Sequence, residues 1–269
     1  MATHVIYKLG PFEVPRLPGE RHVRVYLPTE RPDVEPLPVL YMFDGQNIFH
    51  DSPSFSGGWY LHHAVHDLTA AGHTAPVIVG IDHGNENRVH ELSPFACPES
   101  RGEVNNLIRW IVRELRPRIN KEFNVSHDVG NTAIGGSSMG GLAALHAHFR
   151  RPDVFGAALC MSPSLWFANH QIYAHLAGQP LPWSSRIYID AGAHEGDMLR
   201  DAERLVDQLR ERGYDDTSLM WLTDPYGSHS EQDWRKRAPS AIEFLFSGKH
   251  GQYDGASRDD DPAPEGQAA

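Results

Sequence analysis

A serine at the centre of a glycine-rich pentapeptide could carry nucleophilic chemistry in this chain: Gly136-Ser137-Ser138-Met139-Gly140. An apolar run precedes the pentapeptide and a helical pattern rich in alanine and leucine follows it. The spacing G-x-S-x-G between a strand and a helix is typical of a sharp turn that presents the central hydroxyl to a substrate. Glycine permits such a turn and lets strand and helix approach closely. We therefore predict that Ser138 is a nucleophile.

A serine hydroxyl attacks only when a base removes its proton, and the base is commonly a histidine oriented by a carboxylate. Two polar segments downstream each follow a predicted strand; one contains Asp190, Glu195 and Asp197, and the other ends in His229. The order serine, carboxylate, histidine is that of the α/β-hydrolases. Asp190 would still belong to the strand and Asp197 could cap the next helix. Glu195, in the loop itself, is the preferred acid, with the other two left open.

The reaction also needs hydrogen-bond donors for the developing oxyanion. One is normally the backbone N–H that follows the nucleophile, here that of Met139, and the other comes from a loop after an earlier strand. Residues 43–47 follow a buried strand and could supply it. Three aromatic residues, Trp59, Trp166 and Phe167, could line an acyl pocket, although core positions for them are equally open.

Short apolar runs alternate with amphipathic segments along the chain. Such alternation predicts a mostly parallel sheet with helices on both faces, whose site lies beyond the carboxyl ends of the strands. A long connection, 82–101, could form part of a pocket wall. Strands are expected at 21–27, 38–43, 76–81, 132–135, 155–161, 187–192 and 219–222, and helix faces at 107–115, 198–209 and 241–246.

The composition is that of a globular protein rather than a nucleic-acid or membrane protein. The chain has 269 residues, a hydrophobic content of 40% and a formal net charge of −11, which disfavours nucleic acid and anionic membranes as partners. No apolar run is long enough to cross a bilayer. We predict one domain over residues 1–250 and a disordered acidic tail over 251–269. Without a secretory signal pattern at the N-terminus, the expected location is cytoplasmic.

Histidine and cysteine could in principle hold a metal. His62 and His66 stand four residues apart on a probable helix, whereas His146 and His148 would point to different faces. The sequence has no H-E-x-x-H motif and no cysteine pair at zinc-finger spacing. Cys160 lies in an apolar run and is predicted to be a buried thiol, with nothing that requires a disulfide. We predict neither a metal nor another cofactor.

Five blocks of the sequence together resemble the putative esterase branch of the α/β-hydrolases, which holds esterase D-like, siderophore (enterochelin-type), feruloyl and acetyl-xylan esterases and the mycolyltransferases. The resemblance extends over about residues 20–248, with the blocks in the family's order. The matching blocks are 39–49, 135–141, 162–166, 192–195, and His229 with Trp234 behind it.

The resemblance implies an α/β-hydrolase fold without a large lid domain. It places the acid three residues after Gly192, at Glu195, and the second oxyanion donor at the backbone of Gln46. It implies a serine carboxylic-ester hydrolase that forms an acyl-enzyme on a small acetyl, feruloyl or siderophore-type ester or lactone. An acyltransferase and a non-catalytic binding protein on the same fold are the alternatives. The formylglutathione-hydrolase branch has its own serine-elbow sequence, which is not matched here.

Overall fold

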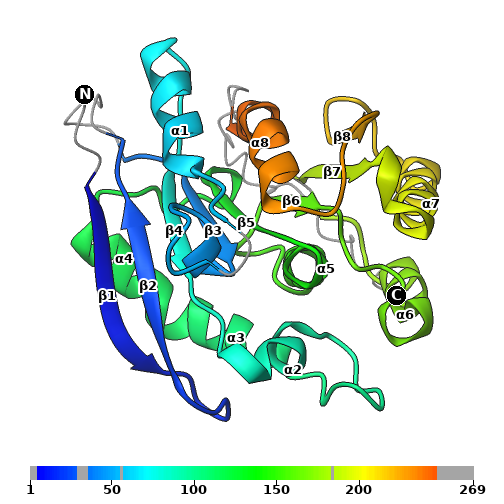
Figure 1. Ribbon diagram of the computed structural model, residues 1–269, viewed down its shortest axis with the longest axis horizontal. Helices are drawn as coiled ribbons and strands as arrows, with labels where there is room; N and C mark the ends of the chain where they lie inside the picture. The colour runs from blue at the N-terminus through cyan, green and yellow to red at the C-terminus, as the bar shows by residue number, and fades with distance from the viewer. Residues whose placement is uncertain (1–4, 29–35, 55–56, 183–184, 247–269) are drawn as a thin grey trace, which may run out of the picture.

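A single eight-stranded sheet forms the centre of the computed structural model, which describes residues 5–28, 36–54, 57–182 and 185–246 (Figure 1). Over these residues the strand order is β1-β2-β4-β3-β5-β6-β7-β8. The strands are β1 (Ile6–Glu13), β2 (Glu20–Tyr26), β3 (Val39–Phe43), β4 (Val77–Ile81), β5 (Thr132–Ser137), β6 (Ala157–Met161), β7 (Arg186–Gly192) and β8 (Leu219–Asp224). The pairs β1–β2 and β2–β4 are antiparallel and the others are parallel. The predicted mostly parallel sheet is confirmed.

Helices cover both faces of this sheet. The helices α1 and α8 pack on one face, and α3 to α7 contribute their apolar side chains to the core on the other. The α-helices are α1 (Leu61–Ala70), α2 (Arg88–Leu92), α3 (Val104–Trp110), α4 (Arg116–Glu122), α5 (Met139–Arg150), α6 (Phe167–Ala177), α7 (Asp197–Glu211) and α8 (Glu231–Phe246). A π-helical stretch, η3 (Ile111–Leu115), joins α3 to α4, and the short 3-10 turns are η1 (Gly45–Asn47), η2 (Asn85–Asn87), η4 (Val129–Asn131) and η5 (Ala193–Glu195).

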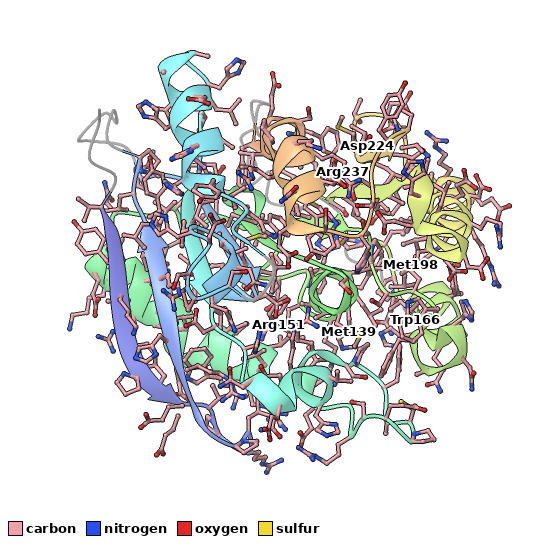
Figure 2. The ribbon with its side chains drawn as sticks, viewed as in Figure 1. Met139, Arg151, Trp166, Met198, Asp224 and Arg237 are labelled. Carbon is pink, nitrogen blue, oxygen red and sulfur yellow. The ribbon has the colours of Figure 1, made fainter. Side chains whose placement is uncertain are left out.

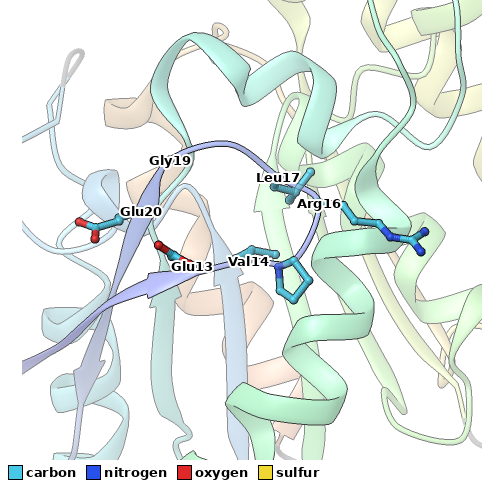
Figure 3. Close-up of a pocket in the computed structure, with 7 residues that line it drawn as sticks. Glu13, Val14, Arg16, Leu17, Gly19 and Glu20 are labelled. Atoms are coloured by element: carbon cyan, nitrogen blue, oxygen red, sulfur yellow. The ribbon is translucent and has the colours of Figure 1, made fainter.

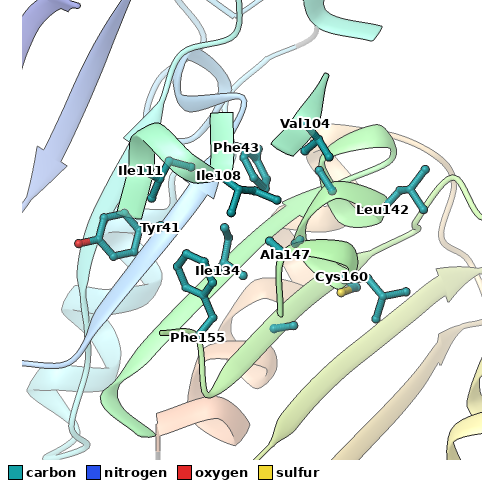
Figure 4. Close-up of a cluster of buried hydrophobic side chains, with 14 of the residues drawn as sticks. Tyr41, Phe43, Val104, Ile108, Ile111, Ile134, Leu142, Ala147, Phe155 and Cys160 are labelled. Atoms are coloured by element: carbon teal, nitrogen blue, oxygen red, sulfur yellow. The ribbon is translucent and has the colours of Figure 1, made fainter. Parts of the chain in front are cut away.

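The central strands are buried on both sides, which explains why they read as continuous apolar runs. In β3, Tyr41 and Phe43 pack into one core cluster and Met42 into the cluster on the opposite face. Figure 4 shows the first cluster, in which Tyr41 and Phe43 of β3 lie near Ile134 of β5. Two-sided burial fixes the register of each strand, because a slip of one residue would exchange the two faces.

The carboxyl ends of the parallel strands lie at one edge of the sheet, and polar residues follow them, the predicted Ser138, Glu195 and His229 among them. Asp44 follows β3, Ser138 follows β5, Ser162 follows β6, and Glu195 and His229 follow β7 and β8. The sheet therefore brings segments almost two hundred residues apart to one edge. The predicted tail, 251–269, lies outside the described residues, and the single-domain division stays a prediction.

Candidate active site

Ser138 occupies a strained turn between β5 and α5. Its backbone angles are φ 56° and ψ −121°, which a non-glycine residue seldom adopts. The backbone N–H of Ser138 donates to the carbonyl of Met161 at 2.9 Å, so the neighbouring strand holds the turn. A Cβ added at Gly136 would lie 2.7 Å from the backbone carbonyl carbon of Gly140, which explains why this position needs glycine. The geometry is that of a nucleophile elbow.

The hydroxyl of Ser138 is hydrogen-bonded to another serine. Its Oγ lies 3.2 Å from Oγ of Ser164, and the Ser164 N–H donates to the Ser138 carbonyl at 3.0 Å. Among the described residues, no hydrogen bond joins the Ser138 hydroxyl to the His229 imidazole. The structure thus brings Ser138 to the same sheet edge as His229 without a direct hydrogen bond between the two side chains.

His229 and Glu195 are joined directly. Nδ1 of His229 lies 2.9 Å from Oε2 of Glu195, and the glutamate side chain is fully buried while the imidazole is 36% exposed. Because a carboxylate only accepts, Nδ1 carries the proton of this bond and Nε2 of a neutral ring is left free to accept another. The indole of Trp234 packs edge-on against the imidazole, with ring centroids 4.9 Å apart. Carboxylate and indole together fix the orientation of the ring.

The other carboxylate oxygen of Glu195 has its own donors. Oε1 accepts hydrogen bonds from the Ser162 hydroxyl and from the backbone N–H of Gly192, each at 2.7 Å. Burial alone would raise the pKa of the Glu195 carboxyl, but the bonds from His229, Ser162 and Gly192 outweigh it and hold the pKa below its ordinary value. Glu195 is therefore ionised at neutral pH and able to stabilise a cationic imidazole.

Ser162 was not among the sequence-predicted site residues, yet it lies at the centre of this network. Its Oγ accepts hydrogen bonds from Nε1 of Trp234 at 2.9 Å and from Nη2 of Arg237 at 3.1 Å while donating to Glu195. Two sequence signals mark Ser162: its place directly after β6, where parallel strands gather functional side chains, and its position at the start of the 162–166 block that resembles the esterase family. Neither signal specifies its role. Arg237 carries no such signal because it lies inside a helix.

The two competing carboxylates have other partners. Asp190 is fully buried; its Oδ2 lies 2.9 Å from Nε of Arg237 and its Oδ1 accepts the Ser162 N–H at 3.0 Å. Burial raises the pKa of the Asp190 carboxyl, and the Arg237 guanidinium opposes that rise. Asp197 is exposed in the first turn of α7 and pairs with Arg200. Arg237 also lies 3.8 Å from Oε1 of Glu195 and 3.7 Å from Oδ2 of Asp224, and Figure 2 shows it beside Asp224.

The two predicted oxyanion donors lie at the start of helical turns. Met139 is the first residue of α5, and Gln46 is the middle residue of η1. Backbone N–H groups in the first turn of a helix have no acceptor within that helix. The side-chain oxygen of Gln46 accepts the N–H of His83 at 3.1 Å, which anchors that turn to the following connection.

Of the three aromatic residues suggested for a pocket, two are in the core. Trp59 is 2% exposed, with its ring 5.7 Å from that of Trp234, and Phe167 is 5% exposed. Trp166 is 49% exposed at the start of α6, where Figure 2 shows it. Trp166 is thus the member of this set whose ring is available to a ligand, and Trp59 supports the indole behind His229.

The described residues contain no group of three or more histidine, cysteine, aspartate or glutamate side chains placed to hold a metal ion. His146 approaches Asn105 and His148 approaches Phe155 and Ser185, so the two face different elements. Cys97 and Cys160 are free thiols. In the part of the chain that the structure describes, no helix combines the length and apolar character needed to cross a membrane.

A surface hollow of about 450 Å³ lies at the turn between β1 and β2 (Figure 3). None of the predicted catalytic side chains lines it. Its lining consists of Glu13, Val14, Pro15, Arg16, Leu17, Gly19 and Glu20.

The fold and the serine turn define an α/β-hydrolase. Residues 15–244 match the model of the family described as "Putative esterase", and the chain belongs to that family. Ester hydrolysis is the class of reaction that this membership assigns to it.

Sequence relatives agree with this family. YbbA of Bacillus subtilis (strain 168) is 23% identical over 244 residues, which cover 85% of this chain and 93% of YbbA. Iron(III) enterobactin esterase of Dickeya dadantii (strain 3937) is 26% identical over 266 residues, covering 91% of this chain and 55% of that protein. The chain thus spans about half the length of this second relative.

The fold is also similar to that of a solved siderophore esterase. The enterobactin esterase of Shigella flexneri superposes with a TM-score of 0.72 at 21% identity, over 91% of this chain and 59% of that one. At this level of identity the likeness shows the shared α/β-hydrolase fold. The predicted fold class is thereby confirmed.

Proposed function

We propose that this protein is a serine carboxylic-ester hydrolase whose triad is Ser138, His229 and Glu195. The observation that carries the proposal is the 2.9 Å contact of His229 with the buried Glu195 carboxylate, at the same sheet edge as the strained Ser138 turn. A carboxylate on Nδ1 leaves Nε2 as the base, which is the arrangement that a serine nucleophile requires. Hydrogen bonds from base to nucleophile are often long outside the substrate complex.

In the proposed reaction, Ser138 Oγ attacks the ester carbonyl as Nε2 of His229 takes its proton. Glu195 stabilises the imidazolium, and the N–H groups of Gln46 and Met139 hold the oxyanion. His229 then protonates the departing alcohol, which leaves an acyl group on Ser138. Water, deprotonated by the same imidazole, attacks this acyl-enzyme and releases the carboxylic acid.

We propose a small acyl ester or lactone of the siderophore type as substrate. Support comes from relatives named as iron(III) enterobactin esterases and from the siderophore triacetylfusarinine C esterase of Aspergillus fumigatus, which is 28% identical over 195 residues. The exposed indole of Trp166 offers a face on which an aromatic acyl group could stack. A cytoplasmic location stays a prediction, as does the absence of a nucleic-acid partner.

The first prediction tests the nucleophile. Ser138→Ala should lower kcat for a nitrophenyl ester by roughly 10⁴- to 10⁶-fold, because the attacking oxygen is gone while the fold persists. The measurement is steady-state hydrolysis, with circular dichroism as the check on folding. A fluorophosphonate probe, read by intact mass, should label the parent protein and not this variant.

Ser164→Ala is the matched control, since the Ser164 hydroxyl lies 3.2 Å from that of Ser138. This variant should still be labelled, because Ser164 does not occupy the elbow. If labelling disappears with Ser164→Ala and persists with Ser138→Ala, the nucleophile is Ser164 and the proposed assignment is wrong. Product analysis with added alcohols separates hydrolysis from acyl transfer.

A further inference from the structure

Asp44, which connects β3 to η1, has an unusual backbone conformation at a place that matters for the proposed oxyanion hole. Its angles are φ 58° and ψ 45°, in the left-handed region, and its side chain makes no capping hydrogen bond to the turn. Its carbonyl accepts the N–H of Asn47 at 2.9 Å, so the conformation of Asp44 sets the direction of the turn that contains Gln46. Something outside the turn must hold the carboxylate.

Arg88 of α2 holds that carboxylate with both arms of its guanidinium. Nε lies 2.7 Å from Oδ1 of Asp44, and Nη2 lies 2.7 Å from Oδ2. The aspartate side chain is only 5% exposed and the arginine side chain 28%. Two parallel charge-assisted bonds in a largely buried place fix the plane as well as the position of a carboxylate.

The same carboxylate lies against the start of α5. A Cβ added at Gly140 would be 3.2 Å from Oδ2 of Asp44, so the aspartate borders the helical turn that begins with Met139. A negative charge there is also favourable to the helix N-terminus. Asp44 therefore belongs to one backbone segment that would supply an oxyanion donor and borders the other.

The segment that carries Arg88 is itself anchored. Glu91, three residues further on α2, forms a buried ion pair with Arg21 of β2 and accepts the N–H of Gly84 at 2.7 Å. The backbone N–H of His83 donates to the side chain of Gln46 at 3.1 Å. The connection 83–92 thus holds the η1 turn at two points, through Gln46 and through Asp44.

We propose that Arg88 is a positioning residue for the oxyanion hole. By fixing Asp44, it sets the direction of the Gln46 N–H and the position of η1 relative to the first turn of α5. This inference rests on the proposed function, because the oxyanion hole has meaning only for acyl chemistry. Arginine suits the task better than lysine, because its planar fork binds both carboxylate oxygens at once.

The second prediction follows from this role. Arg88→Met should lower kcat for a nitrophenyl ester about 10- to 100-fold with KM changed less than about two-fold, since a misplaced donor stabilises the transition state less and the bound ester hardly differently. Affinity for a boronic acid transition-state analogue should fall by the same factor as kcat/KM. Arg88→Lys, which keeps the charge without the fork, should recover only part of the loss.

Arg151→Met is the matched control. Arg151 also forms a two-armed bond with a carboxylate, that of Asp153 at 2.8 and 2.6 Å, and its side chain is 32% exposed, but it lies beyond the opposite end of α5. This variant should keep parental kcat. Guanidinium chloride at low millimolar concentration should partly restore kcat in Arg88→Met and have no effect on the control.

Two results would overturn the inference. Parental kcat in a folded Arg88→Met protein, even with a lower Tm, would make the ion pair purely structural. A raised KM with unchanged kcat would mean that Arg88 contacts the substrate instead. If Arg88→Met does not fold, Arg88→Lys with full kcat gives the same negative answer. Failure of the proposed function itself is distinguishable, because Ser138→Ala would then retain activity.

Discussion

The Glu195 carboxyl group has a different partner set on each oxygen: Oε2 meets the His229 imidazole, and Oε1 takes the Ser162 hydroxyl and the Gly192 N–H. In the proposed triad, Oε2 thus orients the imidazole, and Oε1 holds the carboxylate in place through its two donors. A glutamine at this position has only one accepting oxygen. Its NH₂ group would therefore face a donor at one of the two places.

The third prediction concerns this residue. Glu195→Gln should lower kcat roughly 10⁴-fold, the loss typical when an amide imposes the wrong imidazole tautomer. Because the pKa of Glu195 is lowered on folding, its ionised form stabilises the native state above the unfolded pKa of about 4.3, and this stability is lost as pH falls through the folded pKa. The unfolding free energy of parent minus variant, measured with urea, should therefore shrink between pH 6 and pH 3.

Asp197→Asn provides the control, because Asp197 lies two residues away with its side chain 83% exposed. It should keep parental kcat. A parental rate for Glu195→Gln together with a large loss for Asp197→Asn would reassign the acid of the triad.

At the site, the sequence was informative about residues that follow strands and silent about those that support them. Ser138 and His229 stand in recognisable contexts, and Glu195 could be preferred because of its loop. The role of Ser162 could not be predicted, since a serine after a strand is common and the resemblance of the 162–166 block assigns it none. Arg237 could not either, because only the tertiary packing of α8 reveals that a helical arginine points into a buried network.

At the scale of elements, α8 joins the site to the sheet. Arg237 is 4% exposed; besides its contact with Ser162, it pairs with the fully buried Asp190 at the end of β7. The helix also places Trp234 behind the imidazole of His229. Docking of α8 on β7 and the geometry of Glu195 are therefore linked through one buried guanidinium.

The fourth prediction tests this link. Arg237→Met should lower the free energy of unfolding by about 3–5 kcal/mol, because the buried Asp190 loses its counter-ion and must then stay charged without a partner or take up a proton. Adding Asp190→Asn should recover most of the loss, as measured by urea denaturation. Arg118→Met removes the exposed pair with Glu122 and should cost at most about 1 kcal/mol. Equal costs for the two arginine variants would contradict a structural role for the buried pair.

Among the strands of the described residues, β1 was the one that sequence patterns did not indicate. Its less exposed residues, Ile6, Leu9 and Phe12, recur every third position instead of every second. The register with β2 shifts between Leu9 and Phe12, so an irregularity in the ladder breaks the alternation that identifies a half-buried strand. As an edge strand, β1 also buries too little surface to produce an apolar run.

At the scale of the whole molecule, two cores on opposite faces of one sheet hold the site edge rigid. Successive side chains of β3 and β6 enter the two cores in alternation, and this is why these strands are continuous apolar runs in the sequence. The runs predicted a mostly parallel sheet but not the order of its strands. Run length indicates two-sided burial, whereas the choice of neighbour depends on contacts distant in sequence.

The fifth prediction belongs to this scale. Leu159→Ala, in the core beneath α8, should cost about 2–5 kcal/mol of unfolding free energy, since Leu159 is fully buried and leaves a cavity. Leu181→Ala, at a position 37% exposed, should stay within about 0.5 kcal/mol. Denaturant unfolding gives both values, and similar costs for the two would mean that the β6 face is not closely packed.

The hydroxyl of Ser162 receives two N–H groups that both originate in α8, so its own proton has one direction left, toward Glu195. His229 directly precedes that same helix. During synthesis, a chain that has emerged only as far as η5 would already contain the proposed nucleophile and the proposed acid, Glu195. It would lack the proposed base, His229, and the two donors of α8 that bind the Ser162 hydroxyl. With the proposed triad, turnover would therefore begin only when α8 has docked, and the chain would be inactive while still incomplete on the ribosome.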